Sequence, residues 1–516
     1  FGCDGAACFH NVDLWRKTSP ADGSPSWAFW PFGAAWMCRN LFDEYLFTKN
    51  NYYLREIFLI LEENVRFCYN VLEKTPDGYA VCPATSPENM FLDHGKKTSI
   101  GLYTENTLAI IRNLFRDYLE ACDALKRESD AAGADSVSAS TATAYSNSAA
   151  VFPDAVLSQS VREILPKIVP TKIGSKGQIL EWNEEFEESE PHHRHLSHLY
   201  EFHPGRGITN RTPELYSAVK ESLTERGDET TGWSMAWKML MWARLEEGTH
   251  IDGLMKLLFR LNEPRDPKMS ERGGVYANLL CAHPPFQMDG TSAIQAGIAE
   301  LLVQSHADEI VILPALPGHW TKGSVKGLGV RGNVCVDITW DEEKTECTLI
   351  SSTDQKRTVR IKGGIQKEIS LTAGIEGNLA ALRLRQLKGE LPGIFNLNIT
   401  GEMRAVADSI RRSGKFQLNA QTGNLDFVLS MLPESERSRY NLPVMKLTIH
   451  YSLNFHRMLL HYHLLLYYRL FSMLKASQAP AIESLPTINL PPLSKSAFTY
   501  FPFSALLMPY SLSFIL

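Results

Sequence analysis

Paired helical segments fill the chain from about residue 34 to about residue 310, and they constrain the fold more than any other feature. Apolar residues recur in them at spacings of three and four, which places these residues on one face of a helix. Several segments begin at or just after Asp, Thr or Ser, the residues that cap helix N-termini. The predicted helices are 41–47, 53–72, 104–126, 154–168, 213–226, 233–245, 251–261 and 291–304.

The segments between these helices are long and rich in Pro, His and Trp. Loops of this kind carry binding and catalytic residues when a rigid scaffold holds them. A ring of paired helices whose loops gather at one end, an α/α toroid, explains the pattern better than a simple bundle. The sequence therefore predicts a mainly α fold for residues 1–312.

Strand-like alternation replaces the helical period after Pro314. Within 334–340 the apolar residues alternate strictly, and similar runs follow at 347–349 and 358–362. This pattern predicts a small antiparallel β-domain over residues 313–365. Residues 366–516 show no clear period and stay unassigned, as an unrelated domain, a disordered tail or a faulty gene model. The low-complexity stretch 130–150 is expected to be a flexible insertion between helices.

Composition excludes several classes of protein. The net charge of -6 gives no reason to expect a nucleic-acid partner. The apolar stretches 458–474 and 501–516 are interrupted or short, so no membrane span is expected. The nine cysteines include no C-x-x-C pair, which argues against a zinc ribbon and a dense disulfide scaffold. A single bridge between Cys335 and Cys347 stays open.

Four loop clusters hold the residues that could carry chemistry. The first combines His10–Trp15, with imidazole, amide and carboxylate groups, and Trp27–Pro31, with further indole rings. Indole faces stack on the C–H faces of sugars, and the polar groups can bind hydroxyls. The alternative is helix capping together with core packing of the Trp side chains.

Two further clusters each present one carboxylate beside a proline turn. Glu88 follows Pro87 and has Met90 and Phe91 beside it, so partial desolvation can make it a proton donor near neutral pH. Ser-Pro-Glu is also an ordinary helix start. Asp289 is the single acid of the loop 283–290, whose two prolines and glycine suit a general base or water-positioning group. A helix N-cap is the alternative for Asp289.

The remaining cluster runs from 178–182 through an acidic stretch into the histidine-rich segment 191–198. His195 and His198 are three residues apart, and no helical H-E-x-x-H frame exists. Imidazoles together with Arg194 are suitable hydrogen-bonding partners for sugar hydroxyls. A structural network and a metal site are the two alternatives.

Together these segments resemble glycoside hydrolase family 95, a family of fucosidases. The resemblance covers about residues 1–365, and order, spacing and several uncommon strings agree. The matching segments are 10–15, 27–36, 86–89, 177–182, 193–198, 231–245, 283–290, 313–320 and 323–329.

The resemblance implies an (α/α)6 barrel that hydrolyses terminal α-1,2-linked L-fucose with inversion, on a fucosylated oligosaccharide and without cofactor or metal. Glu88 matches the general acid, and Asp289 matches the carboxylate that assists activation of water. Arg194 and His195 match a sugar-binding pair, and Asp13 and Trp27 match further contacts in the fucose pocket. A secreted, extracellular protein is implied as well, although no signal peptide is present in the sequence.

The sequence also departs from the family. An Asn-x-Asn pair that orients the water and an N-terminal β-sandwich domain would both precede Phe1, so we expect an N-terminally truncated fragment. Thr291 stands where the family usually has Asn. Three alternatives follow: an α-L-galactosidase, a glycoside phosphorylase on the same toroid, and a non-catalytic sugar-binding relative.

Overall fold

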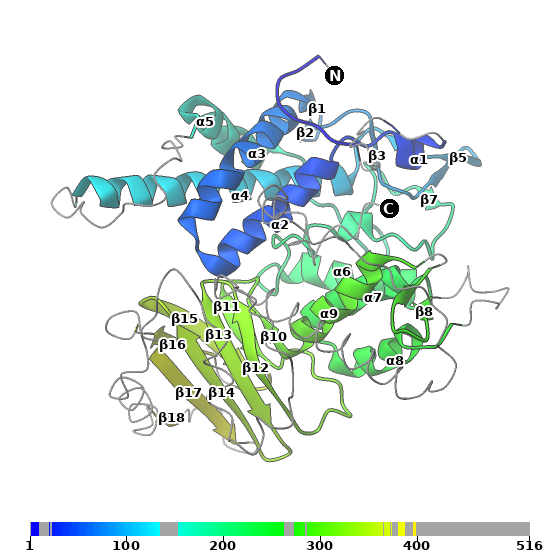
Figure 1. The fold of residues 1–516 in the computed structure, drawn as a ribbon. Helices are drawn as coiled ribbons and strands as arrows, with labels where there is room; N and C mark the ends of the chain where they lie inside the picture. Colours follow the sequence, from blue (N-terminus) through cyan, green and yellow to red (C-terminus); the bar gives the residue numbers. More distant parts are fainter. Residues whose placement is uncertain are drawn as a thin grey trace, which may run out of the picture.

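A helical region packs against a β region in the computed structural model (Figure 1). The structure describes residues 2–9, 20, 23–134, 153–262, 273–283, 286–364, 366–371, 373, 380–387 and 396–398. One hydrophobic core joins the helices, and a second core lies within the β region. None of the helices in these ranges has the length and apolar character that a bilayer crossing requires.

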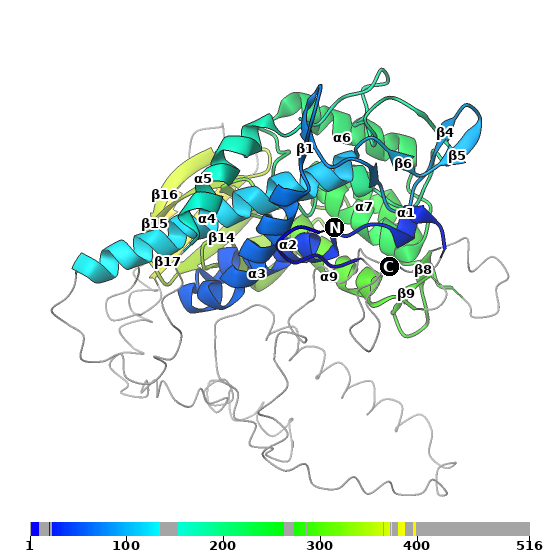
Figure 2. The same cartoon turned by 90° about the horizontal axis from the view of Figure 1, so that it is seen from above.

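The first group of helices comes from the N-terminal third of the chain. Its members are α1 (Pro25–Ala28), α2 (Gly33–Thr48), α3 (Asn51–Asn70), α4 (Glu105–Ala134) and α5 (Ala155–Ile164), which the short 3-10 helix η1 (Leu165–Lys167) follows. Asn50 caps α3 by accepting hydrogen bonds from the backbone of Tyr52 and Tyr53. In Figure 2 the long α4 runs beside α2 and α3, and the three helices pack together.

The second group contains α6 (Pro213–Arg226), α7 (Gly232–Arg244), α8 (Gly248–Leu258) and α9 (Met288–Leu302). Every residue of α7 is buried, and this helix packs against both α8 and α9. A helix that is apolar on nearly all sides belongs in a core, so α7 is the central element on which the loops of this region rest.

Short strands brace the long loops between the helices. They are β1 (Glu73–Thr75), β2 (Gly78–Ala80), β3 (Ala84–Thr85), β4 (Phe91–Asp93), β5 (Lys96–Thr98), β6 (Ile100–Gly101), β7 (Glu187–Glu188), β8 (Gly274–Val275) and β9 (Cys281–Ala282), with the 3-10 helix η2 (Ser197–Leu199). β3 pairs with β6, and β4 pairs with both β5 and β7. The chain between β3 and β4 is therefore anchored at both ends.

Two sheets face one another in the β region. One contains β10 (Val303–Gln304), β11 (Glu309–Ile312), β15 (Gln355–Ile361) and β16 (Gln366–Leu371) in this order. The other contains β12 (Gly323–Val330), β13 (Val334–Trp340), β14 (Lys344–Ser351), β17 (Ala380–Leu387) and β18 (Asn396–Asn398). Apolar side chains of both sheets share one core.

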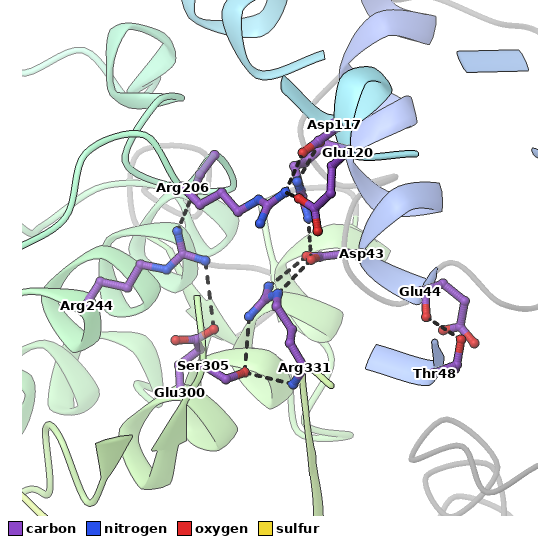
Figure 3. Close-up of polar contacts among 12 residues, drawn as sticks. Asp43, Glu44, Thr48, Asp117, Glu120, Arg206, Arg244, Glu300, Ser305 and Arg331 are labelled. Carbon is purple, nitrogen blue, oxygen red and sulfur yellow. Dashed lines mark hydrogen bonds and ion pairs between the residues drawn. The ribbon is translucent and has the colours of Figure 1, made fainter. Parts of the chain in front are cut away.

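A charged network joins the two regions (Figure 3). Arg331, at the turn after β12, pairs with Asp43 of α2 through Nε to Oδ1 at 2.8 Å and Nη2 to Oδ2 at 2.9 Å. Asp43 also binds Arg39, which pairs with Asp117 of α4. The backbone N–H groups of Gly332 and Asn333 donate to carbonyls at the end of α2.

The eight predicted helices are all confirmed, with shifts of up to four residues at most ends; α2 begins eight residues earlier than predicted, and α4 ends eight residues later. The prediction that the β-domain is antiparallel needs one correction: β11 pairs with β15 in parallel. The strands between them in the sequence, β12 to β14, form the other sheet. Residues 130–134 of the predicted flexible insertion belong to α4, whereas residues 135–152 and 399–516 lie outside the described residues. The domain limits at 312 and 365 stay a prediction, and β16, β17 and β18 follow residue 365.

The disulfide between Cys335 and Cys347 that the sequence left open is not formed. Cys335 lies opposite Ile350, whereas Cys347 lies opposite Ile338, and the two cysteines sit on different faces of their sheet. Side chains on opposite faces of a sheet point apart, so no bond can join them. All nine cysteines are free thiols.

Candidate active site

The Glu88 carboxyl meets two side chains from a segment far away in the sequence. Arg194 Nη2 donates to Glu88 Oε2 at 2.6 Å, and His195 Nε2 lies 3.4 Å from the same oxygen. The Glu88 side chain is 17% exposed and that of His195 is 7% exposed. The structure therefore brings together three of the predicted site residues.

Hydrogen bonds fix the backbone on either side of this contact. Ser197 Oγ, in η2, donates to the carbonyl of Pro87, and Ser234 Oγ, in α7, donates to the carbonyl of Arg194. These bonds tie the Glu88 loop to the Arg194 loop and the Arg194 loop to the central helix. The helix start that Ser-Pro-Glu suggested is not formed, because Glu88 lies in the turn between β3 and β4.

His195 is enclosed by other rings. Its ring lies 5.2 Å from that of His193, and Trp233 meets it edge-on at a centroid distance of 4.8 Å. Burial lowers the pKa of His195, although the Glu88 carboxyl opposes this shift. The imidazole is therefore neutral at neutral pH and can act as a hydrogen-bonding partner without adding charge.

The second predicted carboxylate lies at the start of α9. Asp289 is 8% exposed, and its Oδ1 accepts a hydrogen bond from the backbone N–H of Gly290 at 2.8 Å. Burial raises the pKa of Asp289 to about 7. Because α9 begins at Met288, Asp289 stands inside the first turn and is not the N-cap. A carboxyl group that ionises near neutral pH is suited to accept a proton.

Close packing connects Asp289 to the Glu88 side. A Cβ atom on Gly290 would lie 2.9 Å from Trp233 Cα and 2.1 Å from Cys281 Sγ, so only glycine allows α9 to approach α7 this closely. The ring of Trp233 then contacts His195, and His195 contacts Glu88. Contacts thus lead from Glu88 through His195 and Trp233 to Gly290, the neighbour of Asp289.

His283 belongs to the same cluster. Burial lowers its pKa, as do the charge of Arg194 and the ring of His195, whereas Glu88 raises it. This places His283, from the loop that leads to Asp289, within electrostatic reach of the Glu88 pair. The sequence had marked its loop but not this side chain.

Thr291 has a structural role in this loop. Its Oγ1 accepts a hydrogen bond from the backbone N–H of Cys281 at 3.0 Å and lies 3.4 Å from the carbonyl of Gln287. The hydroxyl therefore holds β9 against the first turn of α9.

The aromatic residues divide between core and site. Trp30, Trp36, Trp237 and Trp242 are buried in the hydrophobic core, which confirms core packing for them. Trp27 is half-buried in α1. Thr85 Oγ1 donates to the carbonyl of Phe29 at 3.2 Å, so the end of α1 lies beside the strand that precedes Glu88. The role of Trp27 as a sugar contact stays a prediction, and Asp13 lies outside the described residues.

Glu181 lies in the cluster 178–182 that the sequence marked, but no role was predicted for this side chain. It is buried, and it accepts hydrogen bonds from Ser86 and Asn89, the neighbours of the Pro87–Glu88 pair. Its contacts could not be predicted locally, because its partners Ser86 and Asn89 come from a distant loop. Within the described ranges, no group of three or more His, Cys, Asp or Glu side chains could hold a metal ion.

Family models match this architecture in two parts. The glycosyl hydrolase family 95 catalytic domain matches residues 1–302, and the glycoside hydrolase family 95 C-terminal domain matches residues 304–383. The first match alone spans more than half of the chain. The chain belongs to glycoside hydrolase family 95.

Individual relatives carry fucosidase names. Alpha-L-fucosidase 2 of Arabidopsis thaliana is 37% identical over 347 residues, which cover 66% of this chain and 38% of that protein. A probable alpha-fucosidase A of Aspergillus oryzae is 31% identical over 242 residues, covering 41% and 32%. The chain thus spans less than half the length of these relatives.

Among solved structures, a putative kojibiose phosphorylase from the human microbiome has a TM-score of 0.40 at 10% identity, covering 71% of this chain and 50% of that one. A likeness at this level carries no argument about fold or function.

Proposed function

We propose that this protein is an inverting α-L-fucosidase that releases terminal α-1,2-linked L-fucose from oligosaccharides. The observation that carries the proposal is the Glu88 carboxyl, largely buried against Arg194 and His195 and connected through Trp233 to a second buried carboxyl, Asp289. Membership of the family and the names of its relatives support the sugar class. Paired helices around α7 support an (α/α)6 barrel as the scaffold.

Glu88 acts as the general acid in this proposal. Its proton passes to the glycosidic oxygen while the bond from that oxygen to the anomeric carbon breaks. Arg194 and His195 bind the sugar hydroxyls, together with Asp13 and Trp27. In the unliganded protein Arg194 donates to Glu88. A bound sugar competes for this donor, and loss of the guanidinium hydrogen bond favours the protonated form of the Glu88 carboxyl.

Asp289 assists the attacking water. Water approaches the anomeric carbon from the opposite face, its oxygen forms the new bond, and its proton passes toward the Asp289 carboxylate. The contact path between the two carboxyls runs through the rings of His195 and Trp233. Inversion requires room for a water molecule between the base and the sugar, so its two carboxyls stand farther apart than in a retaining enzyme.

The test is an assay of fucose release from 2′-fucosyllactose by the full-length gene product that contains these residues. Glu88→Ala and Asp289→Ala are each expected to lower the rate at least about 100-fold, while Asp93→Ala, at an exposed carboxyl, keeps it. Full activity in the Glu88 and Asp289 variants would refute the assignment.

Two further arms test the finer points. Proton NMR of the first product should show the β-anomer, and early α-anomer contradicts inversion. Parallel assays on 3-fucosyllactose and on an aryl α-L-galactoside test linkage and sugar. Faster release of L-galactose than of L-fucose from matched aryl glycosides would replace fucose by galactose in the proposal.

A further inference from the structure

A buried carboxylate holds both sides of the turn that carries Glu88. Glu181 Oε1 accepts a hydrogen bond from Ser86 Oγ at 2.6 Å, and Glu181 Oε2 accepts one from Asn89 Nδ2 at 2.9 Å. All three side chains are almost fully buried. The two donors, Ser86 and Asn89, flank the Pro87–Glu88 pair. Through these two hydrogen bonds Glu181 fixes the turn that carries Glu88.

Glu181 is itself held in place. Arg226 Nη2, from the last turn of α6, donates to Glu181 Oε2 at 2.8 Å, and Arg226 Nη1 donates to Glu188 and to the carbonyl of Pro191. Asn89 Nδ2 also lies 3.1 Å from Glu188 Oε2. The carboxylate therefore stands in a network of donors anchored on a helix, and a buried network of this kind is rigid when its groups are satisfied.

We propose that Glu181 is a positioning residue for the general acid, one that keeps Glu88 at the glycosidic oxygen while protonation takes place. The inference rests on the proposed function of Glu88. When a sugar accepts the hydrogen bond of Arg194, the hydrogen bond from Arg194 to Glu88 is lost. The hydrogen bonds from Ser86 and Asn89 to Glu181 stay. The loop then has a fixed geometry at the step that needs it, and small displacements of a catalytic group are costly.

The donors around Glu181 favour its ionised form, although burial raises the pKa of its carboxyl to about 7. The hydroxyl of Ser86, the amide N–H of Asn89 and the guanidinium of Arg226 all donate toward Glu181. A carboxylate accepts from all of them, whereas an amide must present its own N–H donors to one of the partners. The hydrogen bonds from Ser86 and Asn89 to Glu181 form a clamp on the Glu88 turn. Glu181→Gln therefore keeps the size of the side chain and breaks one hydrogen bond of this clamp.

The test compares two substrates that differ in how much they need a general acid. 2′-Fucosyllactose has a poor leaving group that requires protonation, whereas 2-chloro-4-nitrophenyl α-L-fucoside has one that leaves without it. Glu181→Gln is expected to lower kcat on the first roughly 10- to 100-fold and on the second less than about threefold, with little change in KM. Glu88→Gln should show the same selectivity at larger size.

Asp117→Asn is the matched control. Asp117 is as deeply buried as Glu181 and pairs with Arg39 and Arg206, but its partners lie in α2 and in the chain before α6, away from the Glu88 turn. Its loss should reduce stability and lower both rates equally. If Glu181→Gln does not fold, Ser86→Ala removes one bond of the clamp, keeps the pair of Glu181 with Arg226, and carries the same expectation at smaller size.

The outcomes separate the two proposals. An equal fall of both rates in Glu181→Gln, or no fall, while Glu88→Gln remains selective, overturns the positioning role alone. Absence of selectivity in Glu88→Gln overturns the assignment of Glu88 as general acid, and the inference about Glu181 falls with it. Selectivity in both variants supports both.

Discussion

Trp233 meets the imidazole of His195 edge-on, with ring centroids 4.8 Å apart and ring planes at 66°. The contact joins the first turn of the central helix α7 to the segment that binds Glu88. On its other side the backbone of Trp233 lies against Gly290, the neighbour of Asp289. One residue of a core helix therefore contacts both His195, the partner of Glu88, and Gly290, the neighbour of Asp289.

Asp289→Asn should raise stability above neutral pH. The pKa of Asp289 is about 7 in the folded protein, against 3.8 for an ordinary Asp, so folding favours its protonated form. The stability that this preference contributes is complete below about pH 4 and is lost as pH rises to about 7. Asn does not ionise, so the variant should exceed the wild type at pH 8 by an amount on the order of a few kcal/mol.

Urea unfolding at pH 8 and at pH 4 checks this expectation, because the difference should shrink toward the lower pH. The same variant should lose activity at both ends of the range. In the wild type, kcat/KM should fall as pH drops through about 7, where the carboxylate takes up its proton. An Asp289→Asn stability difference that is equal at both pH values would contradict the shifted pKa.

Gly290→Ala should destabilise the protein. The new Cβ would lie 2.9 Å from Trp233 Cα and 2.1 Å from Cys281 Sγ, and neither the backbone nor this short side chain can move away freely. Overpacking of this kind costs roughly 1–3 kcal/mol or more. Thermal unfolding measures it, and activity should fall because Asp289 shifts with its helix.

Gly297→Ala, in the same helix, is the control for this prediction. Its Cβ would meet Met239 Cε at 2.1 Å, the end of a flexible side chain that can turn aside. Alanine also favours the helix by about 1 kcal/mol relative to glycine, so the net change should be small. Equal losses in the two variants would show that close approach at Gly290 is not special.

Asp43 and Arg331 should show a large coupling energy in a double-mutant cycle. Their two parallel hydrogen bonds, at 2.8 and 2.9 Å, join the helical region to the β region. Charged hydrogen bonds in such settings contribute roughly 1.5–3 kcal/mol. Chemical unfolding of the wild type, Asp43→Asn, Arg331→Gln and the double variant measures this coupling energy.

The exposed pair of Arg211 and Asp308, 3.3 Å apart, supplies the comparison. Exposed ion pairs contribute little, so its coupling should stay below about 0.5 kcal/mol. A similarly small value for Asp43 and Arg331 would mean that the charged network in Figure 3 does not hold the two regions together.

Lys238→Met should stabilise the protein at neutral and acidic pH. The amine of Lys238 is buried in α7 and has no hydrogen-bond partner among the described residues, and burial lowers its pKa to about 7. The unfolded chain holds this proton up to about pH 10.5, so wild-type stability rises between about pH 7 and pH 10.5. Methionine removes the cost of burying the charge.

The gain from Lys238→Met should therefore be greatest at pH 6 and smaller at pH 10. Melting temperatures across this range measure it. The nearby charges of Asp228, which raises the pKa of Lys238, and Arg226, which lowers it, are present in both proteins. A variant that is less stable than the wild type at pH 6 would show that the amine has a partner worth more than its burial.

The local sequence was enough to predict the bounds of a helix where the helix has its own start and stop signals. The predicted helix 213–226 agrees with α6, which begins at Pro213 and ends before Gly227. The sequence pattern missed the first three residues of α8 and of α9, which include Gly248 and Gly290. Both are helical: each lets its helix approach a neighbour closely, Gly248 at the carbonyl of Leu316 and Gly290 at Trp233.

The site shows the same division. The sequence marked Glu88, Arg194, His195 and Asp289 as chemically able residues, because residue type and local turn chemistry are properties of short segments. Which of them touch was decided by tertiary structure alone: the bond between Arg194 and Glu88, the ring of Trp233 on His195, and the hold of Glu181 on the Glu88 turn. Such contacts join residues far apart in the chain, so packing of the whole domain determines them.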